Sequence, residues 1–328
     1  MKIAINGFGR IGRAILRQIL TQAEHQDIEV VHINDIAPLD LCAYLLQYDS
    51  TYGPLPGEAG TAPGTLRVMG REIAFSQEAD LTCVDLSGVD VILECTGIAR
   101  TSDVARRGIK AGAQKVLISG PSPAAERTIV LGANEEALGD AQIVSNASCT
   151  TNGLAPLLKI LDCLFGIESA QMTTIHCYMT SQPLVDAPRG DFARSRSAAM
   201  SMVPTTSSAT HLIDEVLPQL KGRISGAAVR VPTASVSAID LVAQLKKPAP
   251  EAEMLDGLKS AVDRSAQLGW TELPLVSSDL RARPESLVLA VPETRIIGDR
   301  QIRLFGWYDD EWGFSARMLD VARLMTQG

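Results

Sequence analysis

The stretch around Cys149 has the composition and the position of a reactive thiol site. Residues 145–152 read S-N-A-S-C-T-T-N. They stand between a short apolar run that predicts a strand and the apolar segment 153–164, which predicts a helix. A thiol at the start of a helix meets the positive end of the helix dipole, which lowers its pKa and favours the thiolate. Cys149 is therefore our candidate nucleophile.

A cysteine nucleophile needs a base, and His176 is the histidine best placed to serve as one. It closes a run of strand formers within the predicted strand 170–178, so it can lie at a sheet edge near the start of the Cys149 helix. Cys177 follows it and could point to the opposite face of that strand. The other cysteines stand in apolar periodic stretches, where a buried and inert thiol is the commoner outcome: Cys42, Cys83, Cys95 and Cys163.

A glycine-rich turn near the N-terminus has the pattern of a dinucleotide site. Residues 7–12 read G-F-G-R-I-G, directly after the predicted strand 2–6 and at the start of the predicted helix 10–20. The glycines would allow a tight turn, close approach of a pyrophosphate and packing of helix on strand. Asp35 closes the next predicted strand, where a carboxylate accepts from ribose hydroxyls and repels a 2′-phosphate. The pattern favours NAD over NADP; the alternative is a structural turn followed by a strand-end acid.

Composition limits the classes of protein that this chain can form. Its 328 residues correspond to about two domains at ~150 residues each, and 46% hydrophobic with 21% charged residues is ordinary for a globular protein. The net charge of −8, without a dense run of Lys and Arg, gives no support for nucleic-acid binding. No apolar stretch approaches the ~18 residues of a membrane helix. We expect no signal peptide, no bound metal, reduced cysteines and a cytoplasmic location.

The coarse pattern predicts two differently built parts. Up to about residue 145, apolar runs alternate with helical segments, which is typical of an α/β parallel sheet with helices on both faces. The expected strands are 2–6, 29–33, 89–95, 115–119 and 142–144; the expected helices are 10–20 and 102–111, and 53–64 reads as a loop. Beyond Cys149, the strand-like stretches 170–178 and 227–244 approach the period of two of an antiparallel sheet. A long, functional loop is expected over 188–208, a strand over 303–308 and a closing helix over 316–325.

Six motifs, in order along the chain, resemble the phosphorylating glyceraldehyde-3-phosphate dehydrogenase family. They are I-N-G-F-G-R-I-G at 5–12, Y-D-S-T-Y-G at 48–53, S-N-A-S-C-T-T-N at 145–152, T-T-I-H at 173–176, R-V-P-T at 230–233 and W-Y-D-D-E-W-G at 307–313. The resemblance implies a Rossmann NAD-binding domain over 1–148, completed by a C-terminal helix over 315–328. It also implies an α+β catalytic domain over 149–314 with a mainly antiparallel sheet, a homotetramer, and a role in glycolysis and glucose metabolism.

The resemblance also assigns roles to single residues. Cys149 would be the nucleophile that forms a thioester, and His176 its base. The cofactor would be NAD, bound by the glycine-rich turn and by further residues: Gly7, Phe8, Gly9, Arg10, Ile11, Gly12, Asn34, Asp35, Thr96, Gly97, Ser119 and Asp310. Arg230 and Thr180 would bind the substrate phosphate. The attacking inorganic phosphate would be bound by Ser148, Thr150, Ser207 and Ser208 together with Arg194 or Arg196.

Four positions depart from the family pattern. Met179 stands where the family usually has threonine; the related erythrose-4-phosphate dehydrogenases also carry methionine there, and residues 270–277 resemble their sequence as well. Ser208 replaces a glycine of the phosphate loop. Asp310 replaces the asparagine that hydrogen-bonds the nicotinamide amide. An arginine of the adenine pocket has no counterpart in residues 75–80.

Three functions are therefore compatible with the sequence. The first is NAD-dependent oxidation of glyceraldehyde 3-phosphate to 1,3-bisphosphoglycerate. The second is oxidation of erythrose 4-phosphate to 4-phosphoerythronate, with water attacking the thioester. The third is a paralogue of low activity that serves as a binding or regulatory protein, against which the intact Cys149, His176, Asp35 and Arg230 argue.

Overall fold

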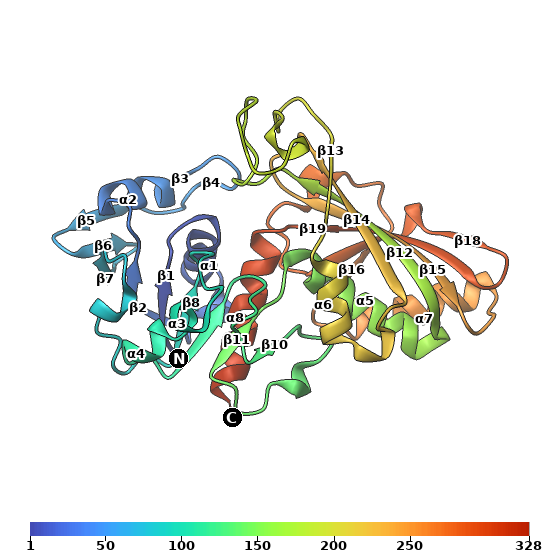
Figure 1. Cartoon of the computed structure of the whole chain (residues 1–328), viewed down its shortest axis with the longest axis horizontal. Coiled ribbons are helices and arrows are strands. Elements are labelled where there is room, and N and C mark those ends of the chain that lie inside the picture. The colour runs from blue at the N-terminus through green and yellow to red at the C-terminus, as the bar shows by residue number, and fades with distance from the viewer. Residues whose placement is uncertain (328) are drawn as a thin grey trace. The chain divides into compact units, whose positions relative to one another are not determined.

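The computed structural model describes residues 1–327 and divides the chain into two compact units (Figure 1). The first unit contains Met1–Ile129, Glu135–Ala147 and the chain from Phe314 onward. The second contains Val130–Asn134 and Ser148–Gly313. The C-terminal helix thus belongs to the same unit as the N-terminal strand, and the region after Cys149 forms a unit of its own.

The first unit is built on a nine-stranded sheet in the order β10-β11-β9-β8-β1-β2-β7-β6-β5. Its strands from β10 to β7 are parallel, and β7, β6 and β5 pair antiparallel at one edge. The central strands are almost wholly buried because helices cover both faces, which explains their continuous apolar runs. The bounds are β1 Lys2–Asn6, β2 Glu29–Asn34, β5 Ala59–Ala62, β6 Thr65–Val68, β7 Arg71–Ser76, β8 Val91–Glu94, β9 Lys115–Ile118, β10 Arg127–Thr128 and β11 Ile143–Ser145.

Helix α1 agrees with the prediction, whereas α2 and the edge strands β6 and β7 were not predicted, and two further segments differ from what was expected. The expected helix over 102–111 is two short helices that meet at Arg106. The expected loop over 53–64 contains strands, because Ala59–Ala62 pairs with its neighbour Thr65–Val68. The helices are α1 Arg10–Thr21, α2 Leu39–Gln47, α3 Ser102–Ala105, α4 Arg107–Lys110 and α8 Trp312–Thr326, with 3-10 turns η1 Ala23–His25, η2 Leu81–Cys83 and η3 Glu135–Ala137; β3 Tyr48–Asp49 pairs with β4 Gly53–Pro54.

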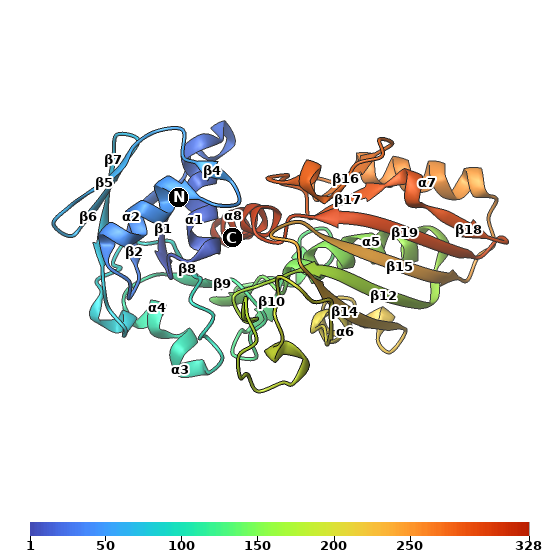
Figure 2. The ribbon, with the colours of Figure 1, turned by 90° about the horizontal axis from the view of Figure 1, so that it is seen from above.

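The second unit is an eight-stranded, mainly antiparallel sheet covered by helices. Its strand order is β13-β14-β12-β15-β19-β17-β16, with β18 beside β19, and Figure 2 shows the long strands β14, β12, β15 and β19 side by side. The pairs β12–β14 and β16–β17 are parallel and the others antiparallel. The strands are β12 Ile167–Cys177, β13 Val203–Thr205, β14 Ile224–Val231, β15 Ser237–Leu245, β16 Leu268–Thr271, β17 Leu287–Ala290, β18 Arg295–Ile297 and β19 Gln301–Tyr308. The helices are α5 Cys149–Phe165, α6 Ala209–Val216 and α7 Glu251–Asp263, with 3-10 turns η4 Ala193–Ser195, η5 Pro218–Leu220, η6 Ser277–Leu280 and η7 Val291–Glu293.

The expected continuous strand over 227–244 is in fact two strands. The chain turns between Val231 and Ser237, where Val236 adopts a positive φ of 65°. As a result β14 runs parallel to β12 on one side, and β15 runs antiparallel to it on the other. The fold class expected from the sequence, a Rossmann-like parallel sheet plus an α+β unit, is confirmed.

Helix α5 is held tightly against the second unit's sheet, and this fixes the position of its first turn. Leu154, Leu157, Leu158 and Leu161 are buried along it. Gly153 has no side chain at the point of closest approach: a Cβ there would lie 2.8 Å from the Ser286 carbonyl oxygen. A larger residue would push away the helix that carries Cys149.

Candidate active site and nucleotide cleft

Cys149 is the first residue of α5, which begins four residues before the helix expected over 153–164, and the thiol is near the helix start as predicted. Ser148 caps the helix: its Oγ accepts from the Thr151 amide at 3.1 Å, and its carbonyl oxygen accepts from Asn152 Nδ2 at 3.0 Å. Ala147, just before the cap, has a φ of 54°, a conformation rarely adopted by residues other than glycine. The strained backbone at Ala147 and the cap at Ser148 thus fix the turn into α5 and, with it, the position of Cys149.

His176 lies near the end of β12 and faces the thiol. Its Nε2 is 3.8 Å from Sγ of Cys149, and its Nδ1 lies 2.8 Å from the carbonyl oxygen of Cys177. A carbonyl oxygen can only accept a hydrogen bond, so Nδ1 carries the proton and Nε2 presents its lone pair to Cys149. This is the tautomer that a base for the thiol requires.

The electrostatics of the pair differ from the sequence-based expectation of a lowered thiol pKa. Burial, reinforced by the Asp310 carboxylate, raises the pKa of the Cys149 thiol to about 12, while hydrogen bonds from Thr150 and the charge of Arg230 act in the opposite direction. Burial and Arg230 lower the pKa of His176 to about 4. The free protein therefore holds a neutral thiol beside a neutral imidazole at pH 7.

A buried hydroxyl network behind the pair was not predicted from the sequence. The Tyr308 hydroxyl lies 2.9 Å from Thr150 Oγ1 and 2.8 Å from Thr174 Oγ1, and the tyrosine ring meets the His176 ring edge-on with centroids 6.0 Å apart. Thr150 is only 4% exposed. This network positions the two catalytic candidates from behind, and it places the Thr150 hydroxyl inside the protein. The only available signal was the position of Tyr308 in a recognised motif.

Arg230 lies directly beside the pair. It is the register partner of His176 on the neighbouring strand β14, and its Nη1 donates to the Cys177 carbonyl oxygen at 3.3 Å. Met179 and Thr180 follow the end of β12 and are exposed, Met179 by 43%. Of the side chains expected to meet the substrate phosphate, Arg230 thus lies level with the base on the neighbouring strand, and Thr180 lies three residues beyond the end of β12.

The structure distinguishes the two loop arginines. Arg194 reaches Thr205 Oγ1 at 2.6 Å and Thr206 Oγ1 at 3.0 Å, next to Ser207 and Ser208 at the start of α6. Arg196 is exposed and pairs with Asp186 at 2.9 Å. Arg194 therefore shares a segment with the serines expected to bind inorganic phosphate, whereas Arg196 is neutralised elsewhere in the loop.

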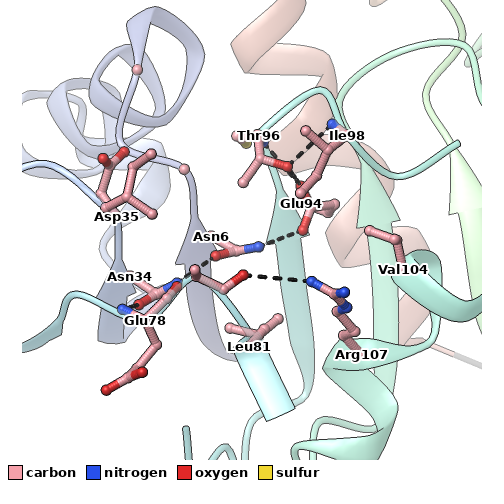
Figure 3. A pocket seen from close by; sticks show the side chains of 15 residues that line it. Asn6, Asn34, Asp35, Glu78, Leu81, Glu94, Thr96, Ile98, Val104 and Arg107 are labelled. Atoms are coloured by element: carbon pink, nitrogen blue, oxygen red, sulfur yellow. Dashed lines mark hydrogen bonds between the residues drawn. The ribbon is translucent and has the colours of Figure 1, made fainter. Parts of the chain in front are cut away.

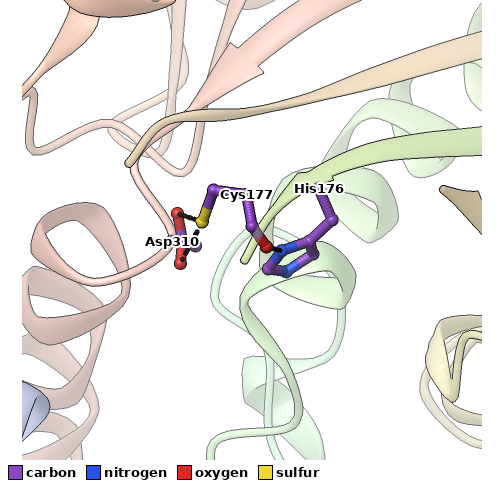
Figure 4. Close-up of side chains that lie close together, drawn as sticks. All are labelled: His176, Cys177 and Asp310. Carbon is purple, nitrogen blue, oxygen red and sulfur yellow. Dashed lines mark hydrogen bonds between the residues drawn. The ribbon is translucent and has the colours of Figure 1, made fainter. Parts of the chain in front are cut away.

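Asp310 is buried beside Cys177 (Figure 4), a contact that the sequence did not suggest. The Cys177 thiol lies 3.1 and 3.2 Å from the two carboxylate oxygens. Ligand atoms of His176, Cys177 and Asp310 all lie within 4.8 Å of one another, close enough to share a metal ion. From the sequence we expected no metal here.

Two of the cysteines expected to be buried are exposed. Cys83 and Cys163 are on the surface, Cys95 is half-buried, and only Cys42 and Cys177 are fully buried. The prediction failed because Cys163 lies on the outer face of α5 and Cys83 at the end of an exposed 3-10 turn, although both have apolar neighbours in sequence.

In the first unit, the glycine-rich turn forms a cradle between β1 and α1. Gly7 has a φ of 91°, and a Cβ there would lie 2.7 Å from the Cys95 carbonyl carbon and the Thr96 amide nitrogen. A Cβ on Gly12 would lie 2.3 Å from the Gly7 carbonyl oxygen. Gly9, the N-cap of α1, has no side chain to cap the first amides, and a Cβ there would meet no atom of residues 1–327 within 4 Å. The start of α1 is thus open to a pyrophosphate.

A cavity of about 340 Å³ extends from this turn across the ends of the parallel strands (Figure 3). At one end, Asp35 accepts from the Phe8 amide at 2.5 Å and from the Ala37 amide at 2.8 Å. Asn34 donates to Asn6 Oδ1 at 2.8 Å, and Asn6 donates to the buried Glu94 at 2.5 Å. This arrangement fits a dinucleotide whose ribose hydroxyls meet Asp35.

Not all expected cofactor residues line this cavity. Gly7, Gly9, Asn34, Asp35 and Thr96 do. The Phe8 side chain is in the core, so only its backbone is available. Arg10 pairs with Asp49 and lies over the Tyr52 ring at 5.4 Å, which gives the Y-D-S-T-Y-G motif a positioning role. Ile11, Gly12, Gly97 and Ser119 lie outside the lining, whereas Glu94 and Arg107, which the sequence did not suggest, are part of it.

Comparison with protein families matches both units. The model described as "Glyceraldehyde 3-phosphate dehydrogenase, NAD binding domain" matches residues 1–102, and the model of the C-terminal domain of the same enzyme matches residues 148–310. Together with the cleft and the thiol site, these matches define an NAD-dependent oxidoreductase. None of the helices within residues 1–327 has the length and apolarity needed to cross a membrane.

Full-length relatives agree with this classification. The chain is 45% identical to glyceraldehyde-3-phosphate dehydrogenase of Pseudomonas aeruginosa, over 98% of this chain and 97% of the relative. It is 43% identical to that of Xanthobacter flavus, over 99% and 98%, and 40% identical to glyceraldehyde-3-phosphate dehydrogenase 1 of Bacillus subtilis, over 100% and 98%. The chain belongs to the glyceraldehyde-3-phosphate dehydrogenase family.

Proposed function

We propose that this enzyme oxidises glyceraldehyde 3-phosphate to 1,3-bisphosphoglycerate through a thioester on Cys149. The first unit serves as the NAD-binding domain and the second as the catalytic domain. The observation that carries the proposal is the neutral His176, whose unprotonated Nε2 lies 3.8 Å from the thiol at the start of α5. The names of the full-length relatives support the same substrate.

The residues of this site account for each proton in the reaction. Sγ of Cys149 adds to the aldehyde carbon while Nε2 of His176 carries the thiol proton to the new hydroxyl, giving a hemithioacetal. His176 then takes the hydroxyl proton as a hydride leaves the carbon, and a thioester remains. Bound NAD supplies the hydride acceptor. Attack by phosphate on the thioester carbon breaks the C–S bond, and His176 returns the proton to the thiol. In this proposal the Cys149 amide and His176 would hold the tetrahedral oxygen.

A burst experiment tests the thioester. When enzyme, NAD and glyceraldehyde 3-phosphate are mixed without phosphate, we expect about one NADH per active site and then slow turnover. Added phosphate should restore steady turnover. Steady, phosphate-independent NADH formation from the first turnover would contradict the phosphorylating reaction.

The Arg230 guanidinium supports a substrate-phosphate site. Because exposed Met179 cannot donate a hydrogen bond, Arg230 must carry more of the charge recognition. Arg230→Ala should raise the KM for glyceraldehyde 3-phosphate at least ~10-fold, since a charge-assisted hydrogen bond contributes ~1.5–3 kcal/mol. Arg295→Ala, an exposed arginine of the same unit, is the matched control. Steady-state kinetics that leave the KM unchanged in Arg230→Ala would show that the phosphate binds elsewhere.

For the attacking phosphate, we assign Arg194 together with Ser207 and Ser208 at the start of α6. The free amides of a helix N-terminus and a planar guanidinium are both suited to a phosphate. Ser148 and Thr150 border Cys149, but the hydroxyl of the first caps α5 and that of the second contacts Tyr308. Their hydroxyls would have to exchange these partners to bind the anion.

The Asp35 carboxylate should make the enzyme prefer NAD strongly over NADP. The amides of Phe8 and Ala37 fix its orientation, and a 2′-phosphate at the ribose would meet a like charge. Asp35→Ala should lower the ratio of the KM for NADP to the KM for NAD by about 10-fold or more. Asp40 is an exposed acid on α2, and Asp40→Ala should leave this ratio unchanged. Equal KM values for the two cofactors in the unaltered enzyme would contradict this role.

A second candidate function is oxidation of erythrose 4-phosphate, which Met179 favours. A donor at residue 179 would serve the shorter sugar selectively, because its phosphate lies nearer to Cys149. Met179→Thr should therefore improve kcat/KM for glyceraldehyde 3-phosphate more than for erythrose 4-phosphate. An equal change in kcat/KM for both substrates would show that residue 179 does not take part in binding the substrate phosphate.

We also propose a homotetramer. The long segment between β12 and β13 exposes several large apolar side chains that an intersubunit contact would cover: Met179, Leu184, Val185, Phe192, Met200 and Met202. Sedimentation equilibrium gives the subunit number directly, and a monomer at micromolar concentration would contradict the proposal.

A further inference from the structure

Asp310 is a buried carboxylate whose hydrogen-bond partners are a thiol and a hydroxyl. Only 8% of the residue is exposed, and its carboxylate accepts hydrogen bonds from the Cys177 thiol and, at 3.5 Å, from the Ser237 hydroxyl. Both are neutral donors. A charge removed from water is costly unless an opposite charge or several strong hydrogen bonds compensate it. A ligand group that binds beside Asp310 is therefore favoured if it carries a positive charge.

The charged and titratable groups around Asp310 leave the region negative. Strand β12 contributes His176 and Cys177, both neutral at pH 7, and α5 contributes the neutral Cys149 thiol. The segment that carries Asp310 also contributes Tyr308, which is neutral, and Glu311, whose negative charge repels that of Asp310. Among the described residues 1–327, the cation that acts on it is Arg230 of β14, which donates to the Cys177 carbonyl.

The proposed reaction brings a cation to this region. An oxidised nicotinamide ring carries one positive charge, and the reduced ring is neutral. Hydride leaves a carbon bonded to Cys149, so the accepting ring must lie against that carbon. A ring nitrogen of His176 lies within 4.8 Å of a carboxylate oxygen of Asp310, and Nε2 of the same ring lies 3.8 Å from Sγ of Cys149, so Asp310 is near the reacting carbon. This step of the reasoning rests on the proposed function.

We propose that Asp310 is a specificity-determining residue that makes the site prefer the oxidised over the reduced cofactor. The carboxylate attracts the cationic ring and loses that attraction once the ring is reduced, which favours release of NADH. Cys177 is a positioning residue: its thiol holds both carboxylate oxygens and directs the carboxylate (Figure 4). An asparagine at this position would provide the hydrogen bonds without the charge.

Calorimetric titration of the full-length enzyme with NAD⁺ and with NADH tests the proposal without any aldehyde. At pH 8 with EDTA, Asp310→Asn should lower the ratio of Kd(NADH) to Kd(NAD⁺) about 10-fold or more, mostly through weaker NAD⁺ binding. Glu311→Gln, which removes the same charge one residue away, is the matched control and should change the ratio much less. Cys177→Ser keeps a donor and should retain most of the preference.

The pH dependence supplies a second readout that needs no variant. Burial raises the pKa of Asp310 to about 6, so the carboxylate is charged at pH 8 and mostly protonated at pH 5. The preference for NAD⁺ should therefore fall in the unaltered enzyme as the pH drops through about 6. This arm remains decisive if the variant fails to fold.

Three outcomes would overturn the proposal. They are equal changes in both Kd values in Asp310→Asn, an equal effect of Glu311→Gln, and a preference that is unaffected by pH. If the preference appears only when EDTA is omitted, the compensating cation is a metal held by His176, Cys177 and Asp310, and the proposal is wrong. Failure of the proposed reaction would instead appear in the burst experiment, which does not depend on these titrations.

Discussion

Cys149→Ser is expected to lower the rate of NADH formation from glyceraldehyde 3-phosphate by about 10⁴-fold or more. A serine hydroxyl is a far weaker nucleophile than a thiol, and His176, with a pKa near 4, is too weak a base to compensate. NAD binding should be retained, because the cleft between β1 and α1 belongs to the other unit.

The matched control for this substitution is Cys163→Ser. Cys163 lies on the same helix, is exposed, and has no contact with the site residues described above. Its replacement should leave the rate within about twofold of the unaltered enzyme. If Cys149→Ser retained a tenth of the activity, the nucleophile would have to be another residue.

His176→Asn should slow hydride transfer by ~10²–10⁴-fold, the usual contribution of a general base. Without Nε2, thiolate must form by ionisation of a thiol whose pKa burial raises to about 12. The residual rate should therefore increase with pH, about tenfold per unit, through the neutral range. In the unaltered enzyme His176 stays neutral well above pH 4, so the rate should vary much less.

Stopped-flow measurement of the NADH burst between pH 6 and 9 separates these profiles. His211→Asn, an exposed histidine on α6, serves as the control and should behave as the unaltered enzyme does. A merely structural effect of His176→Asn would lower the rate by the same factor at every pH. Parallel pH profiles in the two enzymes would therefore contradict the role of His176 as base.

The features that could be predicted from the sequence are set by local rules. The turn depends on the absence of a side chain at Gly7 and Gly12, and the strand before it and the helix after it have clear periodicity. The start of α5 at Cys149 follows from the Ser148 cap. Such signals involve residues only a few positions apart, so they can be recognised without the tertiary structure.

The features that were missed depend on contacts between distant residues. The raised pKa of Cys149 reflects burial and the Asp310 carboxylate, which comes from the end of β19. The break between β14 and β15 depends on pairing with opposite sides of β12. Arg107, which lines the nucleotide cavity, lies on the separate short helix α4. The pattern of apolar and polar residues contains no signal for these long-range placements.

The most direct test of the central claim is NADH formation from glyceraldehyde 3-phosphate and from erythrose 4-phosphate, each with and without inorganic phosphate. We predict sustained NADH formation from glyceraldehyde 3-phosphate only when phosphate is present, with acyl phosphate as the product and a kcat/KM at least about 10-fold above that for erythrose 4-phosphate, a difference of ~1.4 kcal/mol in transition-state stabilisation. Faster and phosphate-independent turnover of erythrose 4-phosphate would contradict the assignment of both the substrate and the acyl acceptor.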